Sequence, residues 1–234
     1  AVVFDELALA VRSPPRAVIE MALRRLGVPE SFIELLRDMD NMSLKDTILE
    51  AGRATDHGGE FHQVLFGTPQ GSVEGPSLWM AVADITVDYA ESCSESPVVM
   101  DAGPDGVHTV GNVTFVDDSA YGQEGDEAKE CLARLITLTG KMYYFLGLRR
   151  RPKKCIFSQL IWVRGHLQRM EHRPIAERGL RITEWISDWT TGEVRIGTRD
   201  SFIQEYDYDH EFRHLGYTAS LAGDESKQFS AMHA

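Results

Sequence analysis

Residues 107–122 read Val-His-Thr-Val-Gly-Asn-Val-Thr-Phe-Val-Asp-Asp-Ser-Ala-Tyr-Gly, an apolar and β-branched run that stops at two adjacent carboxylates and then resumes. β-Branched and aromatic residues favour strands, whereas aspartate favours turns and glycine punctuates the ends of elements. The stretch therefore predicts a β-hairpin with Asp117 and Asp118 at its turn.

Two adjacent carboxylates on a rigid hairpin tip are suited to binding a cation. Their charges repel each other, so both stay ionised near neutral pH when a cation, water or a basic group compensates them. Carboxylate oxygens are hard ligands of the kind that Mg²⁺ or Mn²⁺ prefers. For the pair taken alone, a solvated turn whose side chains only cap backbone amides is the simpler explanation. The flanking sequence has to decide between the two.

The composition is that of a globular protein. The chain has 234 residues, of which 43% are hydrophobic and 26% charged, enough for one or two packed domains. The longest apolar stretch, residues 78–87, is interrupted by Asp84, and the start resembles no signal peptide, so we expect no membrane span. Cys93, Cys131 and Cys155 are odd in number and widely spaced, which predicts a reducing, intracellular compartment, cytoplasmic or nuclear.

The charge of the chain is unevenly distributed. The formal net charge is −12, which is unfavourable for a partner rich in phosphate. Residues 149–154, Arg-Arg-Arg-Pro-Lys-Lys, nevertheless place five of the 24 basic residues in one short segment. We therefore expect a local basic patch on an acidic body.

Hydrophobic periodicity and turn residues predict the other elements. The predicted helices cover residues 14–26, a segment opening at Pro29, and residues 77–90 and 126–146. The predicted strands cover residues 2–4, 47–49, 62–66, 155–157, 161–163, 180–182, 193–196 and 214–220, with 91–106 as a polar connector. The apolar residues of the second helix that we expect to face inward are Phe32, Ile33, Leu35, Leu36 and Met39.

Four local patterns stand in a definite order along the chain. Asp5 ends the first strand, Pro69-Gln70-Gly71 opens a helix, the Asp-Asp hairpin follows, and a Gly-Leu…Pro-Lys-Lys turn at 147–154 comes after a helix. Together they resemble the palm domain of reverse transcriptases, most closely those of non-long-terminal-repeat retrotransposons and group II intron maturases.

Individual motifs carry this resemblance. Residues 115–118, Phe-Val-Asp-Asp, resemble the family's aromatic-x-Asp-Asp box, and residues 67–72 resemble its nucleotide-side loop. Residues 147–155 are similar to the lysine-bearing turn, and residues 22–30 to the helix pair after the first catalytic strand. His214-Leu215-Gly216-Tyr217 resembles the Leu-Gly-Tyr of the primer grip.

The resemblance implies an α+β fold. An antiparallel palm sheet carries the acidic hairpin and is backed by the helices at 14–26, 77–90 and 126–146. The implied domains are a palm at residues 1–158 and a smaller β-rich extension with the primer-grip motif at residues 159–234. The fingers segment that precedes a palm in this family is expected to be missing upstream.

The resemblance also implies RNA-directed DNA polymerase activity of a retroelement. Its partners are an RNA template, a DNA primer and deoxyribonucleoside triphosphates, and its cofactor is Mg²⁺ or Mn²⁺. In such an enzyme Asp5, Asp117 and Asp118 bind two metal ions, with Asp118 the weaker or outer ligand. Lys154 protonates or orients the pyrophosphate.

Further residues acquire roles from the same resemblance. The implied nucleotide-binding residues are Ala10, Gln70, Gly71 and Phe115. The implied nucleic-acid-binding residues are Arg149, Arg150, Arg151, Lys153, Leu215, Gly216 and Tyr217. Ala10 stands where the family carries the aromatic residue that excludes ribonucleotides, so we expect that exclusion to be lost.

Some positions depart from the family pattern. Leu9, Ala10 and Val11 replace the usual Ala, aromatic and Asp after the first catalytic aspartate, and Glu74 adds negative charge beside the nucleotide loop. A catalytically degenerate or domesticated palm-like module that binds nucleic acid or protein is therefore an alternative. A metal-dependent phosphodiesterase is a second alternative, although the extra His or Glu ligands typical of such enzymes are not evident.

Overall fold

The computed structural model describes residues 1–8, 14–42, 44–45, 48–49, 52–53, 62–63, 75–101, 103–115, 118–188, 195–214 and 217–219. The chain is of the α+β class. Its α-helices are α1 (Arg16–Arg25), α2 (Glu30–Met42), α3 (Gly75–Cys93) and α4 (Ala128–Phe145). Short 3₁₀ turns cover Gly103–Asp105, Met170–His172 and Ile175–Glu177.

The strands are unevenly distributed, with most of them after α3. Those in the first half are β1 (Val2–Ala8), β2 (Leu44–Lys45), β3 (Ile48–Leu49), β4 (Gly52–Arg53) and β5 (His62–Gln63). Those around α4 are β6 (Val98–Asp101), β7 (Val107–Val110), β8 (Asn112–Phe115), β9 (Asp118–Gly122), β10 (Arg149–Arg150) and β11 (Ile156–Ser158). Those that follow are β12 (Trp162–Val163), β13 (His166–Leu167), β14 (Leu180–Asp188), β15 (Arg195–Ile203), β16 (Glu205–Tyr206), β17 (Phe212–His214) and β18 (Tyr217–Ala219).

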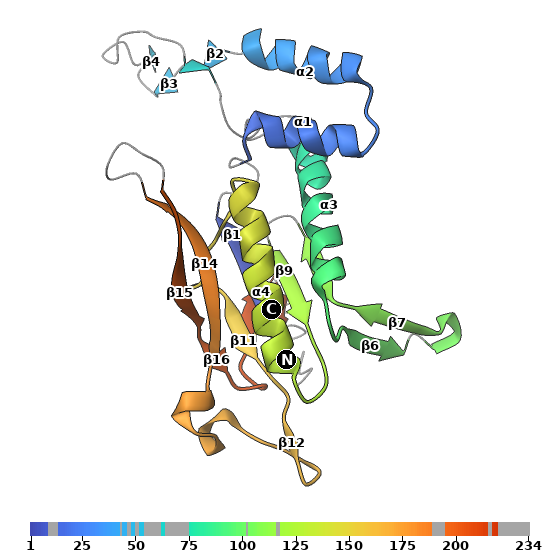
Figure 1. Ribbon diagram of the computed structural model, residues 1–234, viewed down its shortest axis with the longest axis vertical. Coiled ribbons are helices and arrows are strands. Elements are labelled where there is room, and N and C mark those ends of the chain that lie inside the picture. The colour runs from blue at the N-terminus through green and yellow to red at the C-terminus, as the bar shows by residue number, and fades with distance from the viewer. Residues whose placement is uncertain are drawn as a thin grey trace. The chain divides into compact units, whose positions relative to one another are not determined.

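The main sheet has the strand order β16-β11-β1-β9-β8, with β10 also paired to β1. All of its pairs are antiparallel except β11 with β16. In chain order the central part reads β1, helix α3, the hairpin β8–β9, helix α4 and β11 (Figure 1). This is a β-α-β-β-α-β arrangement with the first strand between the third and the fourth. Additional segments are inserted on both sides of α3.

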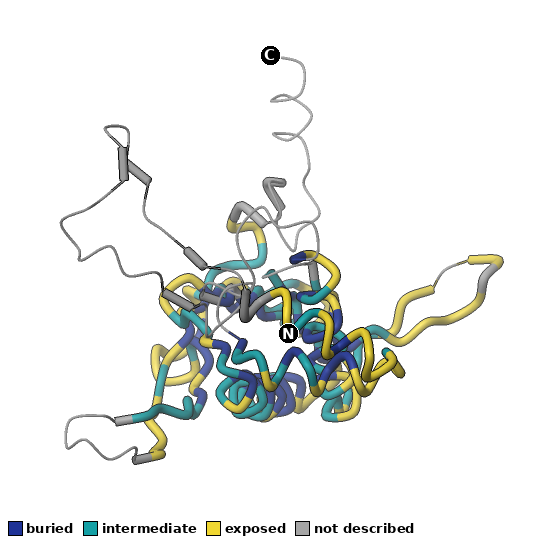
Figure 2. Tube along the Cα trace, turned by 90° about the horizontal axis from the view of Figure 1, so that it is seen from above, coloured by how far each residue is buried: buried dark blue, intermediate teal, exposed yellow. Residues whose placement is uncertain are grey.

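One face of the sheet packs against α4. Val3, Tyr121 and Phe157 from three adjacent strands meet Leu132 and Leu135 of the helix, and all five side chains are buried. Figure 2 marks such buried residues in dark blue. Removal of this apolar surface from water is the main source of stability for the sheet and helix.

The end of α4 is set by a glycine. Gly147 takes φ 75°, a conformation that glycine adopts without strain. The Gly147 N–H then bonds to the Tyr144 carbonyl at 3.1 Å and the Leu148 N–H to the Tyr143 carbonyl at 2.8 Å, the pattern of a Schellman C-cap. The chain reverses here, and Leu148 enters the core just before β10.

Most of the predicted elements occur, with different bounds. The predicted helices correspond to α1, α2, α3 and α4, and the predicted hairpin to β8 and β9, with Asp118 as the first residue of β9. The first strand was predicted too short, since β1 continues three residues beyond Asp5. The prediction of a plain connector at 91–106 was wrong, because β6 lies there and pairs with β7 to form an exposed arm (Figure 1).

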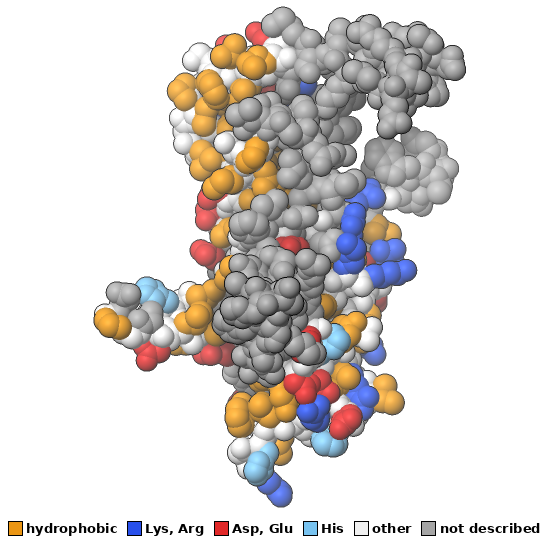
Figure 3. Space-filling model, turned by 180° about the vertical axis from the view of Figure 1, so that it is seen from behind, with side chains coloured by type: hydrophobic (Ala, Val, Ile, Leu, Met, Phe, Trp, Pro, Cys, Tyr) orange, Lys and Arg blue, Asp and Glu red, His pale blue; other side chains and the backbone are white. Residues whose placement is uncertain are grey.

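The predicted inward stripe of α2 was only partly right. Ile33 is 1% exposed, but Phe32, Leu35 and Met39 are each at least half exposed. Figure 3 shows hydrophobic side chains gathered over the helices α1, α2 and α3. Periodicity marked the helix correctly, whereas the choice between its two apolar faces depends on which neighbours it has.

The chain divides into two compact units. Ala1–Ala10 with Thr86–Ala234 form one, and Val11–Ile85 form the other. The predicted boundary at residue 158 lies inside the first unit, because β16 pairs with β11 across it. No helix among the described residues is long and apolar enough to cross a membrane.

Candidate functional site

The strand that carries Asp5 lies directly beside the acidic hairpin. In the β1–β9 ladder Asp5 is opposite Ser119, and Glu6 is opposite Asp118. Side chains that are opposite each other across a ladder share one face of the sheet, and successive residues alternate between faces. Asp5 and Asp118 therefore lie one ladder position apart but point to opposite faces of the sheet.

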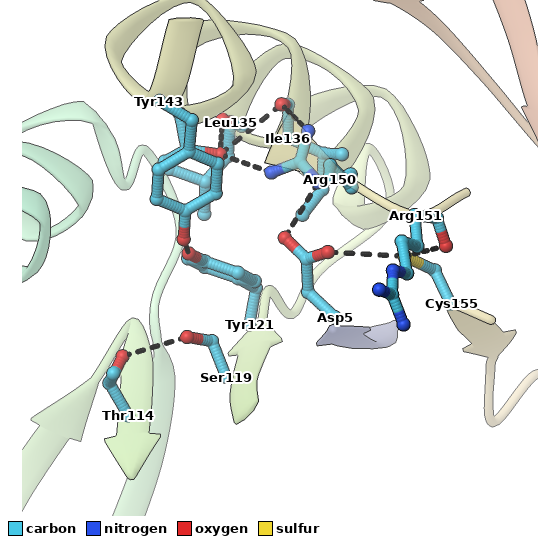
Figure 4. A network of polar contacts seen from close by, with 11 residues as sticks. Asp5, Thr114, Ser119, Tyr121, Leu135, Ile136, Tyr143, Arg150, Arg151 and Cys155 are labelled. Atoms are coloured by element: carbon cyan, nitrogen blue, oxygen red, sulfur yellow. Dashed lines mark hydrogen bonds and ion pairs between the residues drawn. The ribbon is translucent and has the colours of Figure 1, made fainter. Parts of the chain in front are cut away.

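Asp5 points to the face that α4 covers. Its side chain is 1% exposed, and its Oδ2 accepts a hydrogen bond from Arg150 Nε at 2.6 Å. The other oxygen, Oδ1, lies 3.1 Å from the thiol sulfur of Cys155, which donates to it. Both carboxylate oxygens thus have donors inside the protein (Figure 4).

Arg150 is held from several sides. Its Nη1 donates to the Ile136 carbonyl at 2.6 Å and its Nη2 to Thr139 Oγ1 at 2.9 Å, while its guanidinium lies 5.2 Å from the centre of the Tyr143 ring. Burial is the largest single influence and lowers the pKa of Arg150, but the charge of Asp5 together with those of Tyr143, Tyr121 and Cys155 outweighs it, so the pKa of Arg150 is raised. We call Asp5, Arg150 and Cys155, with the α4 groups that bind them, the Asp5 network.

Two buried tyrosines lie next to the Asp5 network. The hydroxyl groups of Tyr121 on β9 and Tyr143 on α4 form a hydrogen bond with each other (Figure 4). Burial, followed by the nearby charge of Asp5, raises the pKa of Tyr121 to about 12. Burial, followed by the charge of Tyr121, raises the pKa of Tyr143 well above its ordinary value. The fold therefore favours the neutral phenols.

The raised tyrosine pKa values predict a loss of stability in alkali. Below about pH 10 the phenols are neutral in both the folded and the unfolded chain, so their contribution is constant. Above that pH the unfolded chain releases protons that the folded chain retains until about pH 12 for Tyr121, so the free energy of unfolding falls. Each tyrosine contributes a slope of up to about 1.4 kcal/mol per pH unit. Urea titrations between pH 9 and pH 12 should show a shallower fall for Tyr121→Phe, and equal slopes would contradict the assignment.

A magnesium site that uses Asp5 and Asp118 together does not fit this geometry. The two carboxylates point to opposite faces, and both oxygens of Asp5 are engaged by Arg150 and Cys155. Among the described residues there is no group of three or more His, Cys, Asp or Glu side chains that could hold a metal ion. The resemblance implied that Asp5 and Asp118 bind metal ions together, but the structure does not bring the two carboxylates together.

The basic segment at 149–154 is split by strand alternation. Arg149, Lys153 and Lys154 are exposed, as a nucleic-acid contact requires, and Arg151 is partly exposed. Arg150 differs, because β10 pairs with β1 so that Arg150 is opposite the buried Leu7. Its side chain is 3% exposed, so the prediction that Arg150 contacts nucleic acid is corrected. It serves as the counter-ion of Asp5 instead.

Several predicted site residues lie outside the described residues. They are Ala10, Gln70, Gly71, Asp117, Leu215 and Gly216. Phe115 ends β8 opposite Asp118, and Tyr217 begins β18 opposite His214, but their side chains are not described. The predicted nucleotide and primer-grip roles of these residues stay predictions.

Sequence reasoning missed the partners of Asp5. The resemblance assigned Arg150 to nucleic-acid binding, whereas Cys155, Thr139 and Tyr143 were given no role. One signal was present: Thr139 and Tyr143 continue the buried stripe of α4 at positions four residues apart. Polar groups at buried helical positions need partners, so they indicate a polar network.

A scan against protein-family models found no match, and a search of curated proteins found none either.

Proposed function

We propose that this chain is the palm region of a retroelement reverse transcriptase, and that its reaction class is RNA-directed DNA synthesis. The observation that carries the proposal is the sheet order. An aspartate-bearing first strand lies directly beside a hairpin strand that begins at a second aspartate, Asp118. The motifs of the reverse-transcriptase palm occur along the chain in the same order as these elements.

The surroundings of the hairpin support the same proposal. Phe115, the last residue of β8, is opposite Asp118, the first residue of β9, so Asp118 stands at the end of the hairpin ladder. After α4 come the exposed cations Arg149, Lys153 and Lys154, a charge pattern that suits phosphate. We assign the chain RNA template, DNA primer and nucleotide partners on this basis.

A second candidate function is a palm-like module without catalysis that binds nucleic acid. The specific observation that favours it is the engagement of Asp5 by Arg150. A guanidinium that is hydrogen-bonded to a carboxylate competes directly with a metal ion for the same oxygens. In this case the palm architecture serves binding only.

Primer extension separates the two candidates. The purified chain is incubated with an RNA template, a labelled DNA primer and deoxyribonucleoside triphosphates in Mg²⁺ or Mn²⁺. For a polymerase we expect extension. We expect Asp118→Asn to reduce it at least about 100-fold, because a metal ion held by that carboxylate would stabilise the transferred phosphoryl group by several kcal/mol. The matched control is Asp126→Asn, an exposed carboxylate before α4.

The outcomes discriminate clearly. Extension that depends on Asp118 and not on Asp126 supports the polymerase. Binding of template and primer without extension supports the second candidate. A chain that neither extends nor binds contradicts both.

A further inference from the structure

Helix α4 and strand β14 run side by side along the surface of the first unit (Figure 1). The Thr183 N–H donates to Thr137 Oγ1 at 3.3 Å, and further along both elements the Tyr144 hydroxyl lies 2.6 Å from Ser187 Oγ. Residues about two turns apart on the helix thus contact residues four positions apart on the strand. The two elements form a long seam with side chains fixed on both walls.

The first half of the seam opens into a cavity. Its volume is about 820 Å³, and it lies between α4, β14 and β15. Apolar walls come from Leu138, Ile182 and the half-exposed Phe202, whereas Arg181 and Asp200 bring charge to the cavity. A cavity with apolar walls, an accessible aromatic ring and a few charged groups is typical of a ligand site.

The second half of the seam presents aromatic rings. Phe145 is 57% exposed, and its ring centre lies 6.1 Å from that of Trp185. The Tyr144 ring is 6.3 Å from Trp185 and is anchored by Ser187, and the Lys141 ammonium lies 5.0 Å from the Trp185 ring centre. The rings are therefore held in place before any ligand arrives.

The charges along the seam favour an anionic ligand. Within the described part of the chain, Lys141 and Arg181 have no carboxylate partner, while Arg134 is bound to Glu95. Asp200 is the acidic residue of the cavity lining. From Arg134 to Phe145 the helix advances roughly 16 Å, so the cations and the rings are spread over a length that an extended chain would follow.

We propose that this seam, which we call the α4–β14 groove, binds a single-stranded stretch of nucleic acid. Bases stack on Phe145 and Phe202, and phosphates bind Lys141 and Arg181. Stacking on aromatic rings and neutralisation of phosphates by cations are the two features by which proteins hold single strands without reading their sequence. The inference rests on the proposed function for the identity of the partner, but not on catalysis.

Binding is tested by fluorescence anisotropy on the full chain with labelled oligouridine RNA and oligothymidine DNA. We expect Lys141→Ala/Arg181→Ala to weaken binding about 10-fold or more and to reduce the slope of log affinity against log salt by about 1.4, the contribution of two phosphate contacts to a single strand. We expect Phe145→Ala/Phe202→Ala to weaken it at least about 5-fold per ring. Similar losses for RNA and DNA indicate contacts with base and phosphate, whereas a larger loss for RNA indicates a contact with the 2′-hydroxyl, and both support the groove.

The controls remove exposed cationic and apolar side chains outside the groove. Arg164→Ala/Arg169→Ala deletes two exposed cations outside the groove, and Ile175→Ala deletes a side chain that is 80% exposed. Unfolding midpoints within about 2 °C of the unmodified chain show that the variants fold. If both groove variants bind within twofold of the controls, or if polyglutamate displaces the oligonucleotide from the groove as well as nucleic acid does, the inference is overturned.

Primer extension by the same variants keeps this inference separate from the proposed function. If the chain extends the primer but the groove substitutions do not weaken nucleic-acid binding, the inference is contradicted and the polymerase proposal stands. Binding through the groove without extension supports the inference and contradicts the polymerase.

Discussion

Replacement of Arg150 by Met should cost the fold about 3–5 kcal/mol of unfolding free energy, because it leaves the Asp5 carboxylate buried without a counter-ion. The Asp5 side chain is 1% exposed and that of Arg150 3%, so water cannot take over the role of the missing partner. The Arg150 guanidinium also satisfies the Ile136 carbonyl and the Thr139 hydroxyl, which both lose a donor. Urea denaturation followed by circular dichroism measures the loss.

Arg149→Met is the matched control, since Arg149 precedes Arg150 on β10 and is exposed. We expect it to change stability by no more than about 0.5 kcal/mol. Asp5→Asn should also be destabilising, because it removes the partner of the buried Arg150. The double variant should lose less stability than the sum of the two single variants, because each single variant leaves one residue of the pair buried without its partner. Equal effects of Arg149→Met and Arg150→Met would show that the Asp5 network does not hold the strand and helix together.

Glu205→Ala should be comparably destabilising, by about 3–5 kcal/mol, through a second buried ion pair. Glu205 is 4% exposed, and its Oε1 accepts hydrogen bonds from Arg173 and from Gln159 Nε2, the latter at 2.9 Å. Its Oε2 accepts the Gly179 N–H at 2.7 Å. Truncation of Glu205 removes the acceptor of both the buried Arg173 guanidinium and the buried Gly179 N–H.

The position of Glu205 explains why the loss should be global. Glu205 lies on β16, opposite Phe157 of β11. Its carboxylate binds Arg173 and Gly179, so it connects the edge strand of the main sheet to the segment that leads into β14. The matched control is Glu171→Ala, whose partner His172 is as exposed as Glu171 itself, at about two thirds. A surface pair of this kind contributes at most about 1 kcal/mol. Thermal unfolding of the two variants side by side tests the difference, and a Glu205→Ala midpoint no lower than that of Glu171→Ala would rule it out.

The candidate site was predicted only in part. The order of strand, hairpin and helix around the acidic residues followed from local patterns, because β-branched runs, turn residues and helical periodicity depend on a few neighbouring residues. The partner of Asp5 did not, because Arg150 is 145 residues away and the contact forms only when β10 and β1 pair. A run of arginines gives no local sign of which one will point inward.

Through its resemblance to a known family the sequence implied an α+β fold, and by itself it predicted an acidic hairpin, helices at 14–26, 77–90 and 126–146, and a basic turn after the last of them. These features rest on spacing and composition within single segments. The tertiary structure alone decided that Asp5 and Asp118 point to opposite faces of the sheet. The reason is register: in a ladder with a two-residue period, a shift of one position exchanges the buried face for the open one. That choice is made by long-range packing against α4.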